Sequence, residues 1–246
     1  MISSRKLISF VYLIFFSILL VINYSFGRHI NEEADKVMPL LQPAGYAFAI
    51  WTVIYALLAI WILRGFFVSK KYDPVYLELK YVLPINFVLN SMWVLTFTNE
   101  QLLWSVIIIV LIWATRLYTY LKVKWTKLDS FWNIAPFSVY LGWITIAMVV
   151  NLFLYLVRLE PAIWNSTQEL TWSIIALIIS TLFAVYTAVN HKDWLLPLVF
   201  LWGYTAIAVR NANTTLTWTA LICSLVVLIA GLYVIVSLRA KHRFKN

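Results

Sequence analysis

Long apolar runs separated by short polar segments alternate along the whole chain. A helix crosses about 30 Å of hydrocarbon with roughly 20 residues and satisfies its own backbone hydrogen bonds, so such runs predict membrane spans. We identify eight: Leu7–Phe26, Ala44–Leu63, Tyr81–Phe97, Leu102–Tyr120, Phe131–Val157, Leu170–Val189, Trp194–Val209 and Leu216–Leu238. The seventh is the shortest and contains Pro197 and Gly203. The pattern therefore predicts an all-α, polytopic membrane bundle of about eight transmembrane helices.

Composition and charge placement agree with this prediction. Hydrophobic residues make up 63% of the 246 positions and charged residues 12%, against about 45–50% and about 25% in soluble domains. The net charge of +9 does not indicate a nucleic-acid partner, because the basic residues flank the apolar runs. Eight spans place every Lys and Arg except Arg28, Lys36, Arg158 and Arg210 on one side. The positive-inside rule then makes both termini cytoplasmic.

The apolar runs contain few groups capable of proton, ion or metal chemistry. No Asp, Glu, Lys or His lies near the centre of any run, which disfavours proton-coupled transport. Arg116 lies about one turn from the inner end of the fourth run, so we expect its side chain to snorkel to the headgroups. The His residues and the single Cys223 show no metal-ligand spacing. We therefore predict no catalytic residue and no metal site.

The chain contains 13 Trp residues, and their positions divide them into two groups. An indole near a span end can bury its ring and hydrate its N–H. We expect this interfacial role for Trp61, Trp104, Trp125, Trp132, Trp164, Trp172, Trp194 and Trp218. Trp51, Trp93 and Trp143 lie deeper, as do Trp113 and Trp202 less clearly. A deep indole N–H needs a partner in another helix or in a ligand, because lipid offers none.

Polar residues accompany the deep rings at helical spacing. Residues 86, 90, 93 and 97 share one face of the third span, and residues 140, 143, 147 and 151 share one stripe of the fifth. Two interpretations remain open, and one cluster can satisfy both. Polar side chains commonly bond across helices in membrane bundles, and spacing alone favours this interpretation. The alternative is a ligand pocket.

The order and spacing of these residues resemble helix motifs of the TspO/MBR family, the tryptophan-rich sensory proteins and translocator proteins. The residues at the motif positions are Pro43, Trp51 and Tyr55 on the second span, Asn86, Asn90, Trp93 and Phe97 on the third, and Tyr140, Trp143 and Asn151 on the fifth, and Asn86 replaces a Gln of the family. The resemblance covers about residues 7–158. It implies a TspO/MBR-like five-helix domain over 1–158 and three additional transmembrane helices over 159–246, with a basic C-terminal tail. The chain lacks the Trp-bearing motif that caps the ligand pocket in the first loop of relatives.

The resemblance also implies a function. We expect a binding, sensory or carrier protein for a flat apolar ligand, such as a porphyrin or a sterol, and no cofactor other than a tetrapyrrole ligand. The ten matching residues become the candidate ligand-binding residues. A permease that uses all eight helices is the alternative, and a tetrapyrrole-degrading enzyme ranks third. The expected partners are the lipid bilayer, the small apolar ligand and a second copy of the chain. The expected location is the bacterial plasma membrane.

Overall fold

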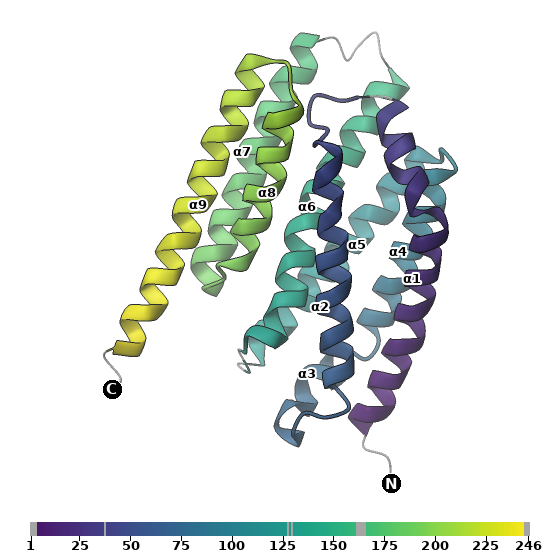
Figure 1. Cartoon of the computed structure of the whole chain (residues 1–246), viewed down its shortest axis with the longest axis vertical. Coiled ribbons are helices and arrows are strands. Elements are labelled where there is room, and N and C mark those ends of the chain that lie inside the picture. Colours follow the sequence, from purple (N-terminus) through teal and green to yellow (C-terminus); the bar gives the residue numbers. More distant parts are fainter. Residues whose placement is uncertain (1–3, 37, 127, 129, 161–165, 244–246) are drawn as a thin grey trace. The chain divides into compact units, whose positions relative to one another are not determined.

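A computed structural model describes residues 4–36, 38–126, 128, 130–160 and 166–243, and all regular structure in these ranges is helical (Figure 1). In chain order the elements are α1 (Ser4–Lys36), the 3-10 helix η1 (Gly45–Ala49), α2 (Ile50–Arg64), η2 (Lys70–Tyr72), α3 (Asp73–Glu78), α4 (Val82–Thr98), α5 (Leu102–Trp125), α6 (Phe131–Leu159), α7 (Ser166–His191), α8 (Leu195–Arg210) and α9 (Thr214–Arg243). Each predicted span overlaps a helix of at least 15 residues, so the all-α polytopic prediction is confirmed.

The helices differ in how clearly they qualify as membrane spans. Among the described residues, six are long and apolar enough on their own, namely α1, η1 with α2, α5, α6, α7 and α9. The segment from η2 through α3 passes the same test together with α4, to which it is bent by 49°. The remaining span, α8, is a shorter apolar helix of 16 residues.

The chain divides into two compact units. The first unit contains Met1–Lys36 and Ala49–Ile144, and the second contains Val37–Phe48 and Thr145–Asn246. In the first unit, α1 packs on α2, α3 and α4, and α4 packs on α5. In the second unit, α7, α8 and α9 pack on one another. The division between the two units falls inside α6, and the sequence-based boundary at residue 158 stays a prediction.

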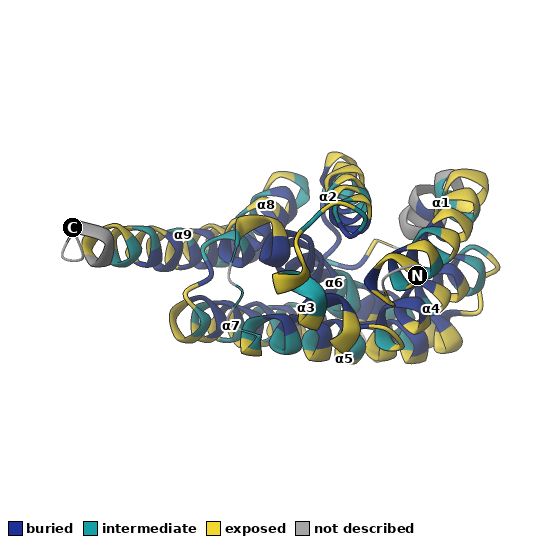
Figure 2. Ribbon diagram, turned by 90° about the horizontal axis from the view of Figure 1, so that it is seen from below, coloured by how far each residue is buried: buried dark blue, intermediate teal, exposed yellow. Residues whose placement is uncertain are grey.

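Large apolar side chains are exposed along most of the long helices. In α9, for example, Ile222 is 60% and Val236 is 64% exposed. Figure 2 shows buried and exposed positions on different sides of individual helices. Exposed aliphatic surface of this extent is unfavourable in water but is ordinary at a lipid contact. The protein is therefore an integral membrane protein.

The segment after α2 is more ordered than a polar loop, and it corrects one prediction. Trp61 is fully buried and does not lie at an interface, because α3 folds back over the end of α2. The ring of Tyr76 stacks on Trp61 with the centroids 4.3 Å apart, and its hydroxyl donates to the Trp61 carbonyl oxygen at 2.9 Å. Arg5 fastens the same segment by donating to the Gly65 carbonyl oxygen at 2.8 Å and by pairing with Asp73.

Candidate functional site

Trp51 on α2 is the centre of a ring cluster in the first unit. Its centroid lies 5.4 Å from Tyr55, 5.6 Å from Tyr140, 6.4 Å from Trp93 and 6.5 Å from Trp143. Tyr55 stacks on it at an interplanar angle of 27°, whereas Tyr140 and Trp143 meet it edge to face. The first unit thus brings together five of the ten candidate residues, from α2, α4 and α6. We call these five residues the ring cluster.

The ring cluster is partly open on its α2 side. Trp51 and Tyr55 are half-buried, whereas Trp93, Tyr140 and Trp143 are buried. The centroid spacings are those of rings in direct contact, so the rings fill the space between them. A flat ligand could enter this cluster only by displacing a ring, and the half-buried Trp51 is the most accessible of the three indoles.

A chain of amide and phenol groups runs beside the rings. Asn90 donates from Nδ2 to the Tyr140 hydroxyl, and its Oδ1 accepts a weak bond from Asn23 Nδ2 at 3.4 Å. The hydroxyl of Tyr55 donates to Asn23 Oδ1 at 2.8 Å. These bonds join α1, α2, α4 and α6, as the interhelical interpretation predicts. Asn23 was missed by the sequence reasoning, although an isolated amide near the end of an apolar run could have identified it.

The other candidate residues lie outside the ring cluster. Phe97 extends it, with its centroid 5.2 Å from that of Trp93. Asn86 is fully buried but faces α5, where its Nδ2 donates to Thr115 Oγ1 at 2.6 Å and to the Ile112 carbonyl oxygen at 3.2 Å. Its geometry is that of an interhelical bond. Pro43 and Asn151 are both buried and belong to the second unit.

Arg116 departs most from its predicted role, because its side chain is fully buried and does not snorkel. The helix continues past the predicted span end to Trp125, which places Arg116 nine residues, or about 13 Å, from the end of α5. Its guanidinium carbon lies 3.8 Å from the ring centroid of Tyr140 and 5.7 Å from that of Phe87. Arg116 therefore adjoins the ring cluster through Tyr140.

Within the described part of the chain, none of the three guanidinium nitrogens of Arg116 has a hydrogen-bond partner. Stacking on aromatic rings stabilises a desolvated cation by about 2 kcal/mol, whereas burying an unpaired ion costs on the order of several kcal/mol. The two rings therefore offset only part of the penalty. The sequence feature that could have identified the burial of Arg116 is the presence of a charged residue inside a membrane span.

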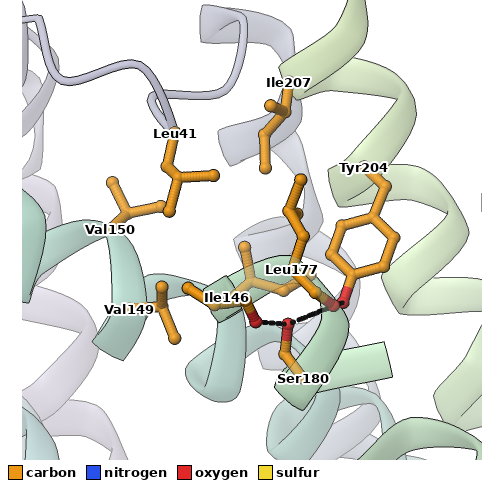
Figure 3. Close-up of a pocket in the computed structure, with 9 residues that line it drawn as sticks. Leu41, Ile146, Val149, Val150, Leu177, Ser180, Tyr204 and Ile207 are labelled. Atoms are coloured by element: carbon orange, nitrogen blue, oxygen red, sulfur yellow. Dashed lines mark hydrogen bonds between the residues drawn. The ribbon is translucent and has the colours of Figure 1, made fainter. Parts of the chain in front are cut away.

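The second unit contains a small apolar pocket between α6, α7, α8 and the segment before η1 (Figure 3). Leu41, Ile146 and Ile207 are among its lining residues, and Ser180 shares a 2.8 Å hydrogen bond with the Tyr204 hydroxyl at its edge. Its free volume of about 10 Å³ is about the space that one water molecule needs. As it stands, this pocket is too small for a flat polycyclic ligand.

Packing accounts for the two unusual residues of α8, the span whose composition favoured a transporter. The helix is continuous from Leu195 to Arg210, and Pro197 lies in its first turn, where proline is tolerated. A Cβ on Gly203 would lie 2.5 Å from Ile146 Cδ1, so glycine permits the close approach of this side chain. The deep indole of Trp202 donates from Nε1 to the Ala47 carbonyl oxygen at 3.0 Å, as expected of a donor that lipid cannot satisfy.

The described residues contain no group of three His, Cys, Asp or Glu side chains that could hold a metal ion. The candidate site is instead a set of aromatic rings with amide and phenol hydrogen bonds and one buried guanidinium. Such a set can stack on a flat apolar molecule and orient its polar groups.

Comparison with known proteins places the chain in a family. The family model described as TSPO-like protein matches residues 3–233. It extends beyond the resemblance seen in residues 7–158 and includes most of α9. No curated protein and no solved structure gives a significant match. Members of this family are generally not enzymes, and the family indicates a membrane-associated sensory or binding role. The match covers far more than half of the chain, which therefore belongs to the TSPO-like family.

Proposed function

We propose that the protein binds a flat apolar ligand, such as a porphyrin or a sterol, at the ring cluster, and carries, stores or senses that ligand within the membrane. The observation that carries the proposal is the placement of Trp51, half-buried and in ring contact with Tyr55, Trp93, Tyr140 and Trp143. Stacking surfaces from three helices meet there, and the neighbouring amides supply hydrogen bonds that can orient a ligand.

Ligand entry follows from the difference in exposure within the cluster. Trp93, Tyr140 and Trp143 are buried and form its base, so movement of the Trp51 ring would create a slot against them. An apolar ligand dissolved in the bilayer would approach from the α2 side, where Trp51 and Tyr55 are accessible. The ligand would thus reach its site from the lipid phase that surrounds the protein. We further propose the bacterial plasma membrane as its location and a homodimer as its assembly.

Titration of the purified protein in detergent with protoporphyrin IX tests the proposal. Binding is followed by quenching of Trp fluorescence and by the shift of the porphyrin absorption band. The variant W93L/W143L removes two ring contacts of about 0.5–1.5 kcal/mol each, which corresponds to a loss of affinity of about five-fold to about hundred-fold. The matched control W104L/W172L removes two indoles that are 58% and 54% exposed, and its affinity should equal that of the wild type.

An unchanged affinity in W93L/W143L, read from the absorption band, would show that the ligand binds elsewhere. Two other functions make different predictions in the same preparation. A permease would move the porphyrin across the membrane of a proteoliposome, whereas a binding protein would hold it without net flux. A tetrapyrrole-degrading enzyme would bleach the absorption band under light, whereas a binding protein leaves the bound chromophore intact.

A further inference from the structure

Arg116 carries a positive charge that no described residue around it neutralises. The side chain is fully buried, and its Nε, Nη1 and Nη2 make no hydrogen bond to any described residue. Its neighbours are the ring faces of Tyr140 and Phe87. A guanidinium has five N–H donors and cannot lose its charge in a protein, so this environment leaves both the charge and the donors unmatched.

Among the described residues, no carboxylate pairs with this cation. The sequence contains no Asp or Glu in α2, α4, α5 or the part of α6 that belongs to the first unit, and the acidic residues of α1, Glu32, Glu33 and Asp35, all lie in its last five residues. Asp73 pairs with Arg5, and Glu78 pairs with Lys122. Glu100 precedes the first residue of α5, and Arg116 lies fourteen residues, or about 21 Å, along that helix. The described residues therefore supply no counter-charge to Arg116, which leaves this role to a bound molecule.

The position of Arg116 relative to the ring cluster indicates which molecule supplies the charge. Tyr140 joins the two: one ring face receives the guanidinium, and its ring meets Trp51 edge to face at 79°. The Tyr140 hydroxyl accepts a hydrogen bond from Asn90, so it keeps its own proton for donation. A guanidinium and a phenol together match the acceptor oxygens of a carboxylate, and charge-assisted bonds of this kind are the strong ones.

We propose that Arg116 anchors a carboxylate of the ligand that the ring cluster binds. The preferred ligand class is then a flat apolar molecule with an acidic side chain, and a neutral molecule of the same shape binds more weakly. This inference rests on the function proposed above, to which it adds the charge of the ligand. It also explains why a cation is retained inside an apolar helix of the bundle, where an uncharged residue would be easier to bury.

Protoporphyrin IX and its dimethyl ester form the test pair, because they share one ring system and differ in the two carboxylates. We expect the wild type to bind the acid about ten- to hundred-fold more tightly than the ester. R116M should bind both compounds with the affinity of the wild type for the ester, and R116K should recover part of the preference for the acid. Retained ester binding shows that R116M is folded. The control R64M removes another arginine beside an aromatic ring, that of Trp132, and should keep the full preference.

The outcomes separate this inference from the proposed function. Equal binding of acid and ester by the wild type, or an undiminished acid preference in R116M, overturns the anchor while leaving the ring cluster intact. If W93L/W143L binds both the acid and the ester as tightly as the wild type does, the proposed function itself is refuted. Repeating the titrations with methanesulfonate in place of chloride tests a free anion as the counter-charge. A chloride ion held at Arg116 would make acid and ester bind alike in chloride, and that result also overturns the ligand-carboxylate proposal.

Discussion

Replacing Tyr140 by phenylalanine removes one hydroxyl and leaves in place the ring that Arg116 and Trp51 contact. In the wild type this hydroxyl accepts a hydrogen bond from Asn90 Nδ2, and both side chains are fully buried. Y140F therefore leaves a buried amide donor without that acceptor, at a cost of about 1–2 kcal/mol. N90L removes the other half of the pair and also the weak 3.4 Å bond from Asn23.

A double-mutant cycle isolates the energy of this bond. Interhelical hydrogen bonds in membrane proteins contribute about 0.6 kcal/mol on average and up to about 1.7, so we expect Y140F and N90L to couple by about 0.5–1.5 kcal/mol. The assay is reversible unfolding in mixed detergent and sodium dodecyl sulfate micelles, followed by Trp fluorescence. Y12F is the matched control, because the buried Tyr12 hydroxyl donates to the Tyr76 carbonyl oxygen at 2.8 Å and has no bond to Asn90. Y12F and N90L should be additive within about 0.5 kcal/mol. A coupling between Y140F and N90L no larger than that of this control would refute the interhelical bond.

Two further predictions concern the segment that closes over the end of α2. G65A places a Cβ 2.7 Å from Tyr76 Cε1 and should lower the free energy of unfolding by about 1–3 kcal/mol. The control G27A adds a Cβ that meets nothing within 4 Å and should raise the free energy of unfolding by about 0.5–1 kcal/mol through helix propensity. Equal effects of the two variants in the same micelle assay would contradict the packing at Gly65. D73N removes the charge that pairs with Arg5, whose side chain is 5% exposed. Both D73N and R5A should make η2 and α3 susceptible to limited proteolysis. Resistance of both variants to the protease would show that this ion pair does not hold the segment in place.

The helical organisation was predictable because hydropathy reports it directly. The third predicted span, Tyr81–Phe97, differs from α4 by one residue at each end. The sequence prediction ended the first span at Phe26, but α1 continues to Lys36. The residues from Asn31 to Lys36 are mostly polar and include good helix formers such as Glu, Ala and Lys, so the helix continues beyond its apolar stretch. Hydropathy detects the lipid-facing length of a helix and not its full length.

Burial inside the bundle was less predictable, since it depends on which neighbour covers each residue. Helical spacing correctly put Asn90 and Trp93 on one buried face of α4. The same spacing could not show that Asn86 on that face donates to α5 or that α3 covers Trp61. Arg116 was misplaced for a similar reason: its distance from the apolar run's end suggested headgroup contact, whereas the neighbouring rings enclose it.

An experimental structure of the protein with protoporphyrin IX bound in a lipid environment tests binding at the ring cluster most directly. Binding at the ring cluster predicts the porphyrin plane in van der Waals contact with Trp51 and at least one of Trp93 and Trp143, with the Trp51 ring displaced from its present position. Porphyrin density confined to the exposed indoles, such as Trp104 or Trp125, with the ring cluster unchanged, would contradict it.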